Sequence, residues 1–285
     1  MLITVIIPAA GRGRRFRAGS NAPQGRSKIE QDLAGRAMFL RSVELFLNRS
    51  HVQQVILAVD PDALETFRLR WGDKLSFHGV ALVPGGKAER WETVQRSLEV
   101  VQDDATHIAV HDAARPLTPT AMIDRVFAAA ECYDAVIPAL PVANTLKRVV
   151  DLETSDEEPS SDPLDAILGE AGKPKVEVRK VVETVSRADL VEVQTPQVFK
   201  RELLVQAYRQ ISEGGFSGAR LAHVTDDASL VESLGEVVYA VQGDPTNFKI
   251  TRPGDMEIAT AIIEKREQHA TASLAKRRLF ADDED

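Results

Sequence analysis

Short apolar runs alternate with segments of helical periodicity from the start of the chain to residue 140, and this alternation constrains the fold strongly. Residues 2–8 are apolar and rich in β-branched side chains, which predicts a strand, and residues 37–48 carry large apolar residues at helical spacing. The same order repeats, with strands predicted at 52–59, 79–83, 107–111 and 135–140 and helices at 61–70, 89–101 and after Thr118. Such alternation predicts a Rossmann-like α/β fold, a mostly parallel sheet with helices on both faces.

A glycine turn follows the first predicted strand directly, in the sequence Pro8-Ala9-Ala10-Gly11-Arg12-Gly13. Glycine has no Cβ, so backbone N–H groups in such a turn can approach a ligand closely. Residues 9–28 hold six Lys or Arg and no Asp or Glu, although the whole chain has a formal net charge of -8. Cations beside a glycine turn are typical of a polyphosphate site. A solvated basic loop would have the same composition, so both interpretations stay open at this point.

Two common nucleotide-binding motifs do not fit this turn. The dinucleotide fingerprint needs a third glycine three residues after the second, and Phe16 stands there. A P-loop ends in Gly-Lys followed by Ser or Thr, whereas Gly13 is followed by Arg14 and Arg15. The sequence therefore indicates a third way of binding phosphate.

The overall composition narrows the classes of partner and compartment. The acidic balance of the 285 residues argues against general binding of nucleic acid or membrane. A lone cysteine, Cys132, excludes an intrachain disulfide framework and fits a reducing compartment. Residues 1–10 lack the basic region of a signal peptide, and their apolar run is too short to span a bilayer. We therefore expect a cytoplasmic protein.

The alternation breaks after Lys147. Residues 151–175 are rich in acids, serine and proline, which predicts an exposed insertion. Residues 176–193 look extended, so we predict that residues 146–193 form a β arm projecting from a single domain that spans residues 1–269. A further strand is predicted at 248–251 and a closing helix at 253–268, whereas residues 270–285, which end in four acids, are predicted to be disordered.

Several motifs occur in order along the chain between Ile7 and Ile263. Together they resemble those of the 2-C-methyl-D-erythritol 4-phosphate cytidylyltransferase family of the non-mevalonate isoprenoid pathway. Each motif alone is weak, but the ordered set is specific. The motifs are Pro8-Ala9-Ala10-Gly11 with Arg15, Lys28, Gly85-Gly86 with Glu89-Arg90, Val110-His111-Asp112-Ala113-Ala114-Arg115-Pro116, Thr145-Leu146-Lys147, Val182-Glu183-Thr184 with Arg187, Gln194-Thr195-Pro196-Gln197-Val198-Phe199, Thr225-Asp226-Asp227-Ala228-Ser229 and Asn247-Phe248-Lys249-Ile250-Thr251.

The resemblance implies a fold of the nucleotide-diphospho-sugar transferase type and a reaction in which CMP passes from CTP to 2-C-methyl-D-erythritol 4-phosphate. The products would be 4-diphosphocytidyl-2-C-methyl-D-erythritol and pyrophosphate. Because both reactants are anionic, catalysis would consist mainly of positioning and charge neutralisation, with Mg²⁺ as the cofactor. The resemblance also implies a homodimer formed through the arm, with no nucleic acid or membrane as partner.

The resemblance assigns roles to residues one at a time. Arg187, on the arm, would reach the acceptor of the neighbouring subunit. The catalytic cations would be Arg15, Lys28 and Lys249; the nucleotide would be bound by Ala9, Ala10, Gly11, Gly13, Gly86 and Thr93; the acceptor would be bound by Asp112, Arg115, Thr145, Arg187, Thr195 and Thr225; and Mg²⁺ would be held by Asp112 or Asp244.

Several of these residues also have structural interpretations. Lys249 would be a gatekeeper if residues 248–251 formed an edge strand. Asp226 and Asp227 would serve a helix cap through Thr225, and His111 is expected to act as a structural hydrogen-bonding group rather than a base.

The sequence departs from the family pattern at a few positions. Additional residues precede Lys28, where Ser27-Lys28-Ile29 replaces Pro-Lys-Gln. Asn144 replaces an aspartate, and Thr93 replaces a serine. Two other functions therefore stay open: ribitol 5-phosphate cytidylyltransferase, and a catalytically idle nucleotide-binding regulator.

Overall fold

A computed structural model describes residues 1–11, 16, 27–151, 178–215 and 224–281. It divides into two compact units, one formed by Met1–Leu140 with Val193–Asp285 and the other by Pro141–Glu192. Across the described residues, no helix is both long and apolar enough to cross a membrane.

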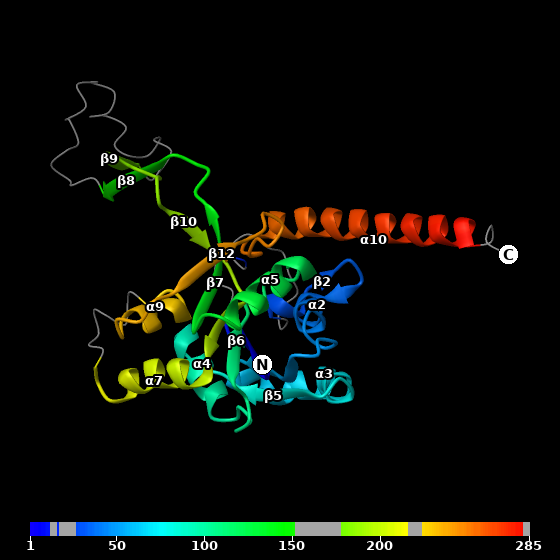
Figure 1. Cartoon of the computed structure of the whole chain (residues 1–285), viewed down its shortest axis with the longest axis horizontal. Helices are drawn as coiled ribbons and strands as arrows, with labels where there is room; N and C mark the ends of the chain where they lie inside the picture. The colour runs from blue at the N-terminus through cyan, green and yellow to red at the C-terminus, as the bar shows by residue number, and fades with distance from the viewer. Residues whose placement is uncertain (12–15, 17–26, 152–177, 216–223, 282–285) are drawn as a thin grey trace, which may run out of the picture. The chain divides into compact units, whose positions relative to one another are not determined.

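The first unit is built on a mostly parallel sheet (Figure 1). Its central strands are β1 (Ile3–Ala9), β4 (Val52–Val59), β5 (Val80–Pro84) and β6 (His107–Val110), and β1 pairs in parallel with β4 and β6. Strand β11 (Gln197–Lys200) is antiparallel to both of its neighbours, β6 and β7 (Ala135–Pro141), and β12 (Tyr239–Gln242) runs parallel to β7. The order is β7-β11-β6-β1-β4-β5.

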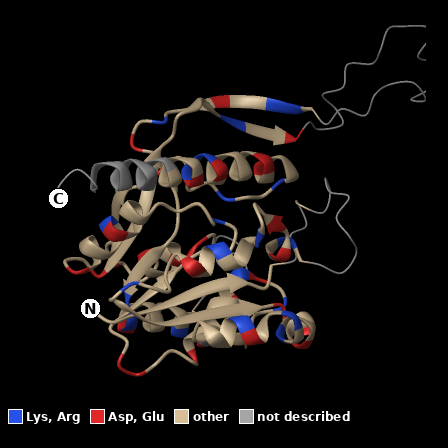
Figure 2. Cartoon of the chain, turned by 90° about the vertical axis from the view of Figure 1, so that its right-hand side faces the viewer, with Lys and Arg blue, Asp and Glu red and all other residues tan. Residues whose placement is uncertain are grey.

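Helices cover both faces of this sheet because successive side chains of each strand point to opposite sides. On β1, Ile3, Val5 and Ile7 belong to one buried cluster and Ile6 to another. The first cluster includes residues of α2 (Met38–Glu44), α3 (Leu64–Phe77) and α5 (Thr120–Ala130). The second includes residues of α4 (Arg90–Leu98), α7 (Arg201–Ser212) and α9 (Asp227–Glu232). The predicted α/β fold is thus confirmed. Figure 2 shows that the charged residues lie mostly on helices and loops.

Short elements connect β1 to α2 and β4 to α3. The 3-10 turn η1 (Lys28–Glu30) precedes a small hairpin of β2 (Asp32–Leu33) and β3 (Arg36–Ala37), and η2 (Pro61–Ala63) leads into α3. The side chain of Asp60 caps η2 by accepting a hydrogen bond from the Asp62 N–H group.

The second unit holds a β-ribbon in the part of the chain predicted to be the arm. Strand β8 (Leu146–Asp151) pairs antiparallel with β9 (Arg179–Val185), and Val149 lies opposite Val181. The short strand β10 (Val191–Val193) follows at the end of this segment. The acidic insertion predicted at 151–175 falls almost wholly outside the described residues.

Two predictions for the C-terminal region differ from the structure. Helix α10 (Pro253–Ala281) continues through residues 270–281, which were predicted to be disordered. After Gly254 this segment contains no glycine or proline and is rich in Ala, Glu, Lys, Arg and Leu, all good helix formers. Residues 248–251 form a loop rather than a strand: the Ile250 N–H group donates to the Ala114 carbonyl, and the Asp255 carboxylate accepts from the Thr251 N–H group at the start of α10.

Candidate nucleotide-binding site

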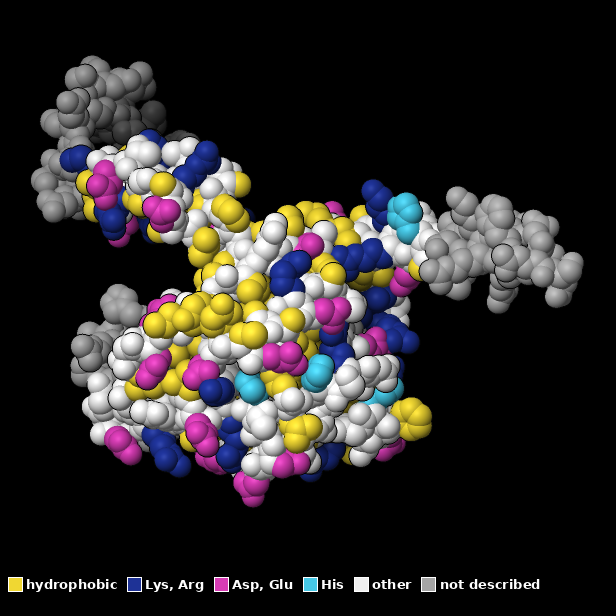
Figure 3. Space-filling model, in the orientation of Figure 1, with side chains coloured by type: hydrophobic (Ala, Val, Ile, Leu, Met, Phe, Trp, Pro, Cys, Tyr) yellow, Lys and Arg dark blue, Asp and Glu magenta, His cyan; other side chains and the backbone are white. Residues whose placement is uncertain are grey.

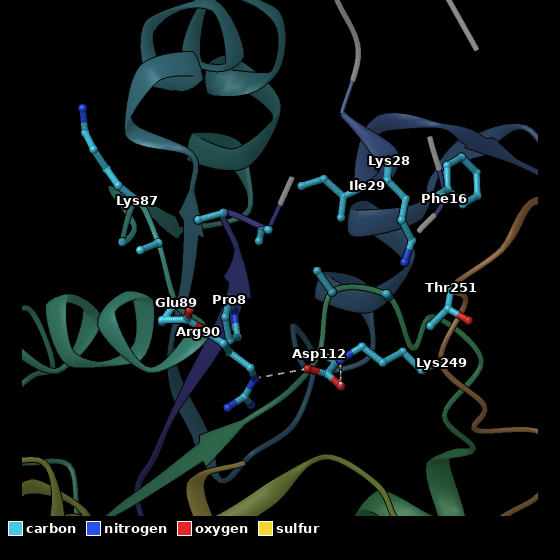
Figure 4. A pocket seen from close by; sticks show the side chains of 17 residues that line it. Pro8, Phe16, Lys28, Ile29, Lys87, Glu89, Arg90, Asp112, Lys249 and Thr251 are labelled. Atoms are coloured by element: carbon cyan, nitrogen blue, oxygen red, sulfur yellow. Dashed lines mark ion pairs between the residues drawn. The ribbon is translucent and has the colours of Figure 1, made fainter. Parts of the chain in front are cut away.

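A cavity of about 510 Å³ lies where β1, β5 and β6 end (Figure 4). Parallel sheets of this kind bind ligands at the carboxyl ends of their strands. The residues that line it come from the turn after β1, from η1, from the loop between β5 and α4, from the turn after β6, and from the loop before α10. They include Pro8, Ala9, Ala10, Gly11, Phe16, Lys28, Ile29, Gly86, Lys87, Glu89, Arg90, Asp112, Lys249 and Thr251.

The two glycines after β5 are required by close packing at the cavity wall. A Cβ on Gly85 would lie 2.7 Å from the Ala10 Cβ, and one on Gly86 would lie 2.3 Å from the Glu92 Cβ. The Gly86 N–H group donates to the Thr93 hydroxyl at 3.0 Å, and the Thr93 side chain is buried. Thr93 does not line the cavity, and its hydroxyl holds the Gly86 turn against α4. Its role toward the base stays a prediction.

Asp112 gathers three cations beside the cavity. Its Oδ2 atom lies 3.0 Å from Lys249 Nζ and 3.3 Å from Arg115 Nε, and its Oδ1 atom lies 3.5 Å from Arg90 Nε. Burial disfavours the charged carboxylate, but Lys249, Arg90 and Arg115 outweigh burial and hold the pKa of Asp112 well below its usual range. Asp112 is therefore ionised at neutral pH, and it draws positive charge to the cavity wall.

Arg90 connects the cavity to a buried polar cluster behind it. Its NH1 group lies 2.7 Å from Asp227 Oδ2, and the Tyr208 hydroxyl donates to Asp227 Oδ1 at 2.5 Å. Burial disfavours the charged guanidinium, but Asp227 and Asp112 outweigh it and raise the pKa of Arg90. The motif Glu89-Arg90 was recognised in the sequence, yet Arg90 was not among the predicted site residues. Only the fold brings it near Asp227, 137 positions away.

Lys28 enters the cavity from η1. Its Nζ atom donates to the Ile250 carbonyl and lies 5.8 Å from the centre of the Phe16 ring. Phe16 is buried with Leu33 and Ile250. Figure 4 shows Lys28 and Lys249 on the Asp112 side of the cavity, whereas Lys87 extends away from them.

Three of the predicted acceptor-binding residues, Asp112, Arg115 and Thr195, are brought together, because Asp112 contacts both of the others. Thr195 is buried and its hydroxyl accepts from the Asp112 N–H group at 3.0 Å, while Arg115 donates to the Asn247 carbonyl at 2.7 Å. Thr225 is exposed and, like these two, does not line the cavity. Thr145 and Arg187 belong to the second unit, where Arg187 donates to the Ala143 carbonyl.

His111 has the structural role that the sequence predicted for it. Its ring is fully buried, with Nε2 3.2 Å from the Arg115 carbonyl and Nδ1 3.2 Å from the Thr195 hydroxyl. Burial lowers the pKa of His111 to about 4. The ring is therefore neutral at neutral pH, and it ties the turn after β6 to the Thr195 segment.

The capping interpretation of the Asp226-Asp227 pair is confirmed for Asp226, whereas the edge-strand interpretation of Lys249 is wrong. The residue that caps α9 is Asp226, whose carboxylate accepts from the Ser229 N–H group at 3.0 Å, not Thr225. Asp227 pairs with Arg90 instead of capping the helix. Lys249 lies in a loop rather than an edge strand, and its ammonium group pairs with Asp112.

Of the predicted catalytic and nucleotide-binding residues, the described part of the cavity brings together Lys28, Lys249, Ala9, Ala10, Gly11 and Gly86, with Asp112 beside them. Arg15 and Gly13 lie outside the described residues.

Comparison with known proteins agrees with the motifs. A family model described as 2-C-methyl-D-erythritol 4-phosphate cytidylyltransferase matches residues 3–159 and 172–265. A protein of that name from Rhodococcus opacus (strain B4) is 39% identical over 264 residues, which cover 92% of this chain and 96% of that protein. One from Acidobacterium capsulatum is 34% identical over 267 residues, covering 93% of this chain and 99% of that protein.

The fold also matches that of solved structures of this family. The crystal structure of 2-C-methyl-D-erythritol 4-phosphate cytidylyltransferase from Thermus thermophilus gives a TM-score of 0.66 at 28% identity, covering 93% of this chain and all of that one. These matches extend through nearly the whole chain and include the motifs that meet at the cavity. The chain therefore belongs to the 2-C-methyl-D-erythritol 4-phosphate cytidylyltransferase family.

Proposed function

We propose that this protein transfers CMP from CTP to 2-C-methyl-D-erythritol 4-phosphate, giving 4-diphosphocytidyl-2-C-methyl-D-erythritol and pyrophosphate. The observation that carries the proposal is a cation-lined cavity at the sheet edge, built from the motifs of a family that matches residues 3–159 and 172–265. The names of the relatives favour this acceptor over ribitol 5-phosphate. The cations at the cavity favour an active transferase over an idle regulator.

The reaction needs no protein nucleophile, because the acceptor supplies an ionised phosphate. One of its oxygens forms a bond to the α-phosphorus of CTP. The bond from that phosphorus to the oxygen bridging the α- and β-phosphates breaks, and pyrophosphate leaves with the electron pair. Negative charge grows on the leaving group, so the protein must supply fixed positive charge and hold the two anions in line.

The residues of the cavity can meet both needs. The turn formed by Ala9, Ala10 and Gly11 would bring backbone close to the nucleotide, and no atom of the described residues beyond Gly11 and its chain neighbours lies within 4 Å of where a Gly11 Cβ would stand. We assign Lys28 and Lys249 to the charge on the triphosphate and the leaving group. Asp112 holds Lys249 and Arg90 at the cavity wall. Arg15 stays a prediction as a further cation of this group.

Mg²⁺ is part of the proposal, and the residues of the cavity fit a Mg²⁺ ion that the nucleotide also binds. Mg²⁺ commonly uses one or two carboxylates together with substrate phosphates and water. Asp112 and Glu89 line the cavity, whereas Asp244 does not, and its Oδ1 atom accepts from the Thr246 N–H and hydroxyl groups. Within the described ranges, no group of three or more His, Cys, Asp or Glu residues could hold a metal ion. The donors therefore fit an ion that is carried by the nucleotide with Asp112 as one ligand, where it would neutralise phosphate charge.

Pyrophosphate release from CTP and 2-C-methyl-D-erythritol 4-phosphate should therefore depend on Mg²⁺. We expect an excess of chelator to abolish release, because the triphosphate loses a neutralising charge. Re-adding Mg²⁺ above the chelator concentration should restore the rate, which controls for unfolding. Full activity in excess chelator would refute the metal requirement.

We also propose a homodimer in which the second unit of one subunit serves the site of the other. The support is the exposed apolar surface of the β8–β9 ribbon within a single chain: Val149 is 39% exposed, Val150 47%, and Val181 and Val182 each 56%. Figure 3 shows such hydrophobic side chains mixed with charged ones. A two-stranded ribbon is marginally stable by itself, so a second copy would give these valines a surface to pack against. A cytoplasmic location stays a prediction from the cysteine usage.

A further inference from the structure

The turn that carries Lys28 is fastened to helix α3 by one buried carboxylate. The side chain of Glu30, at the end of η1, is 4% exposed. Its Oε2 atom accepts from the Ser27 N–H group at 3.0 Å. Its Oε1 atom accepts from the Trp71 indole N–H group at 3.1 Å and lies 2.9 Å from Arg70 NH1. Both oxygens of Glu30 are thus engaged, one by the residue just before Lys28 and the other by α3.

The α3 end of this connection is held firmly by the core. The Trp71 ring packs edge-on against Phe39 at a centroid distance of 5.2 Å, and Phe39 also contacts Phe67 at 5.0 Å. Phe39 is fully buried. The indole N–H group that donates to Glu30 is therefore held in place by core packing. Through it, the turn η1 is held against the buried cluster that contains Phe39 and Phe67.

The position of Lys28 depends on the same turn. Lys28 lies between Ser27, whose N–H group Glu30 binds, and Ile29, which is buried at the cavity. Ser27 and Trp71 donate to different oxygens of Glu30, and in a neutral amide at position 30 an NH2 group would replace one of these oxygens and face an N–H donor, so both contacts could not be kept as they are. Loss of either contact would free one side of the turn, so the backbone that carries Lys28 would be held less firmly against α3.

We propose that Glu30 is a positioning residue for Lys28: it acts through Ser27, Arg70 and Trp71 and does not touch the substrates. The inference rests on the proposed function in one respect, namely that Lys28 meets the triphosphate during the reaction. Misplacement of a catalytic group by about 1 Å can cost about a hundredfold in rate. Loosening the turn should therefore lower turnover while leaving most of the cavity intact.

The test compares the variants Glu30→Gln and Arg70→Met with Arg68→Met. Arg68 lies on the same helix as Arg70, but it pairs with Glu65 at the surface, at 3.3 Å, and serves as the matched control. We expect Glu30→Gln to lower kcat for pyrophosphate release by about tenfold to a hundredfold, with a much smaller change in the KM for CTP. Arg70→Met should show a smaller loss of kcat, and Arg68→Met should match the unsubstituted protein.

A double substitution separates positioning from a general structural role. In a Lys28→Ala background, Glu30→Gln should change kcat by no more than about twofold, because the group it positions is gone. An equal fractional loss in both backgrounds would overturn the inference, as would Glu30→Gln with native kcat. Thermal unfolding shows whether Glu30→Gln folds. If it does not, Arg70→Met is compared in the same two backgrounds, and that comparison decides whether the role is positioning.

Hydrogen exchange gives a readout that does not depend on activity. Backbone amides at residues 27–33 should exchange faster in Glu30→Gln and Arg70→Met than in Arg68→Met. If the unsubstituted protein releases no pyrophosphate, the proposed function fails, and exchange still shows whether Glu30 fastens the turn. Unchanged exchange at 27–33 in both variants would overturn the positioning role whatever the activity.

Discussion

Replacing Lys28 by alanine is expected to lower kcat by about a hundredfold or more, with a smaller rise in the KM for CTP. Lys28 enters the cavity from η1, and the proposed reaction builds negative charge on the departing pyrophosphate. A cation that acts mainly on this charge stabilises the transition state more than bound CTP. Removing a preorganised group of this kind typically costs about 3 kcal/mol. Steady-state pyrophosphate release measured against CTP concentration gives both constants.

Lys200→Ala is the matched control for this prediction. Lys200 ends β11 opposite His107, the first residue of β6, and so lies at the other edge of the sheet from the cavity. It forms an exposed ion pair with Asp134 at 2.8 Å, and such pairs contribute little to stability. We expect native kinetics from Lys200→Ala. Near-native turnover by Lys28→Ala would remove Lys28 from the mechanism.

The second large effect is recovery of activity when two inactive variants are mixed. Lys28→Ala lacks a cation of the cavity, and Arg187→Ala lacks the group that we propose to reach the acceptor of the neighbouring subunit. In a mixed dimer, one site carries both substitutions and the other carries neither. Each mixed dimer should therefore regain about half of the activity of a native dimer. The measurement is pyrophosphate release after subunit exchange, with exchange followed by mass spectrometry of differently labelled subunits.

Arg179→Ala provides the control for this experiment. Arg179 lies on β9 in the same unit as Arg187 and pairs with Asp151 at 3.2 Å on the surface. We expect Arg179→Ala to be active by itself, so that loss of activity in Arg187→Ala reflects its position rather than damage to the unit. A mixture that exchanges subunits and stays inactive would show that Arg187 does not act across the dimer.

The sequence predicts most of the architecture because burial of apolar side chains leaves a local pattern. The continuous apolar run of β1 and the helical spacing before α2 need no knowledge of distant residues. The carboxyl edge of the sheet then places the glycine turn, Gly86 and Asp112 together, since strand ends of a parallel sheet meet at one edge. The place of Lys249, in a loop that the pattern suggested was a strand, came through the family resemblance alone.

The interactions between distant side chains are what local patterns could not supply. Arg90 meets Asp227 across 137 positions, and the Glu30 carboxylate meets Trp71 across 41. The hydroxyls of Thr93 and Thr195, which the family resemblance assigns to substrate binding, each accept from a neighbouring N–H group, at Gly86 and Asp112. A motif shows that a polar residue lies near a site, but only the fold shows which backbone groups its hydrogen-bonding atoms meet.

We expect the cavity at the ends of β1, β5 and β6 to bind CTP and to activate its α-phosphorus toward 2-C-methyl-D-erythritol 4-phosphate. The most direct measurement is pyrophosphate release with ATP, GTP, CTP and UTP, each combined with that acceptor or with ribitol 5-phosphate, with Mg²⁺ present. We expect rapid release from CTP with 2-C-methyl-D-erythritol 4-phosphate and little from every other pair. Faster release with ribitol 5-phosphate or with another nucleotide, or no release from any pair, would contradict this expectation.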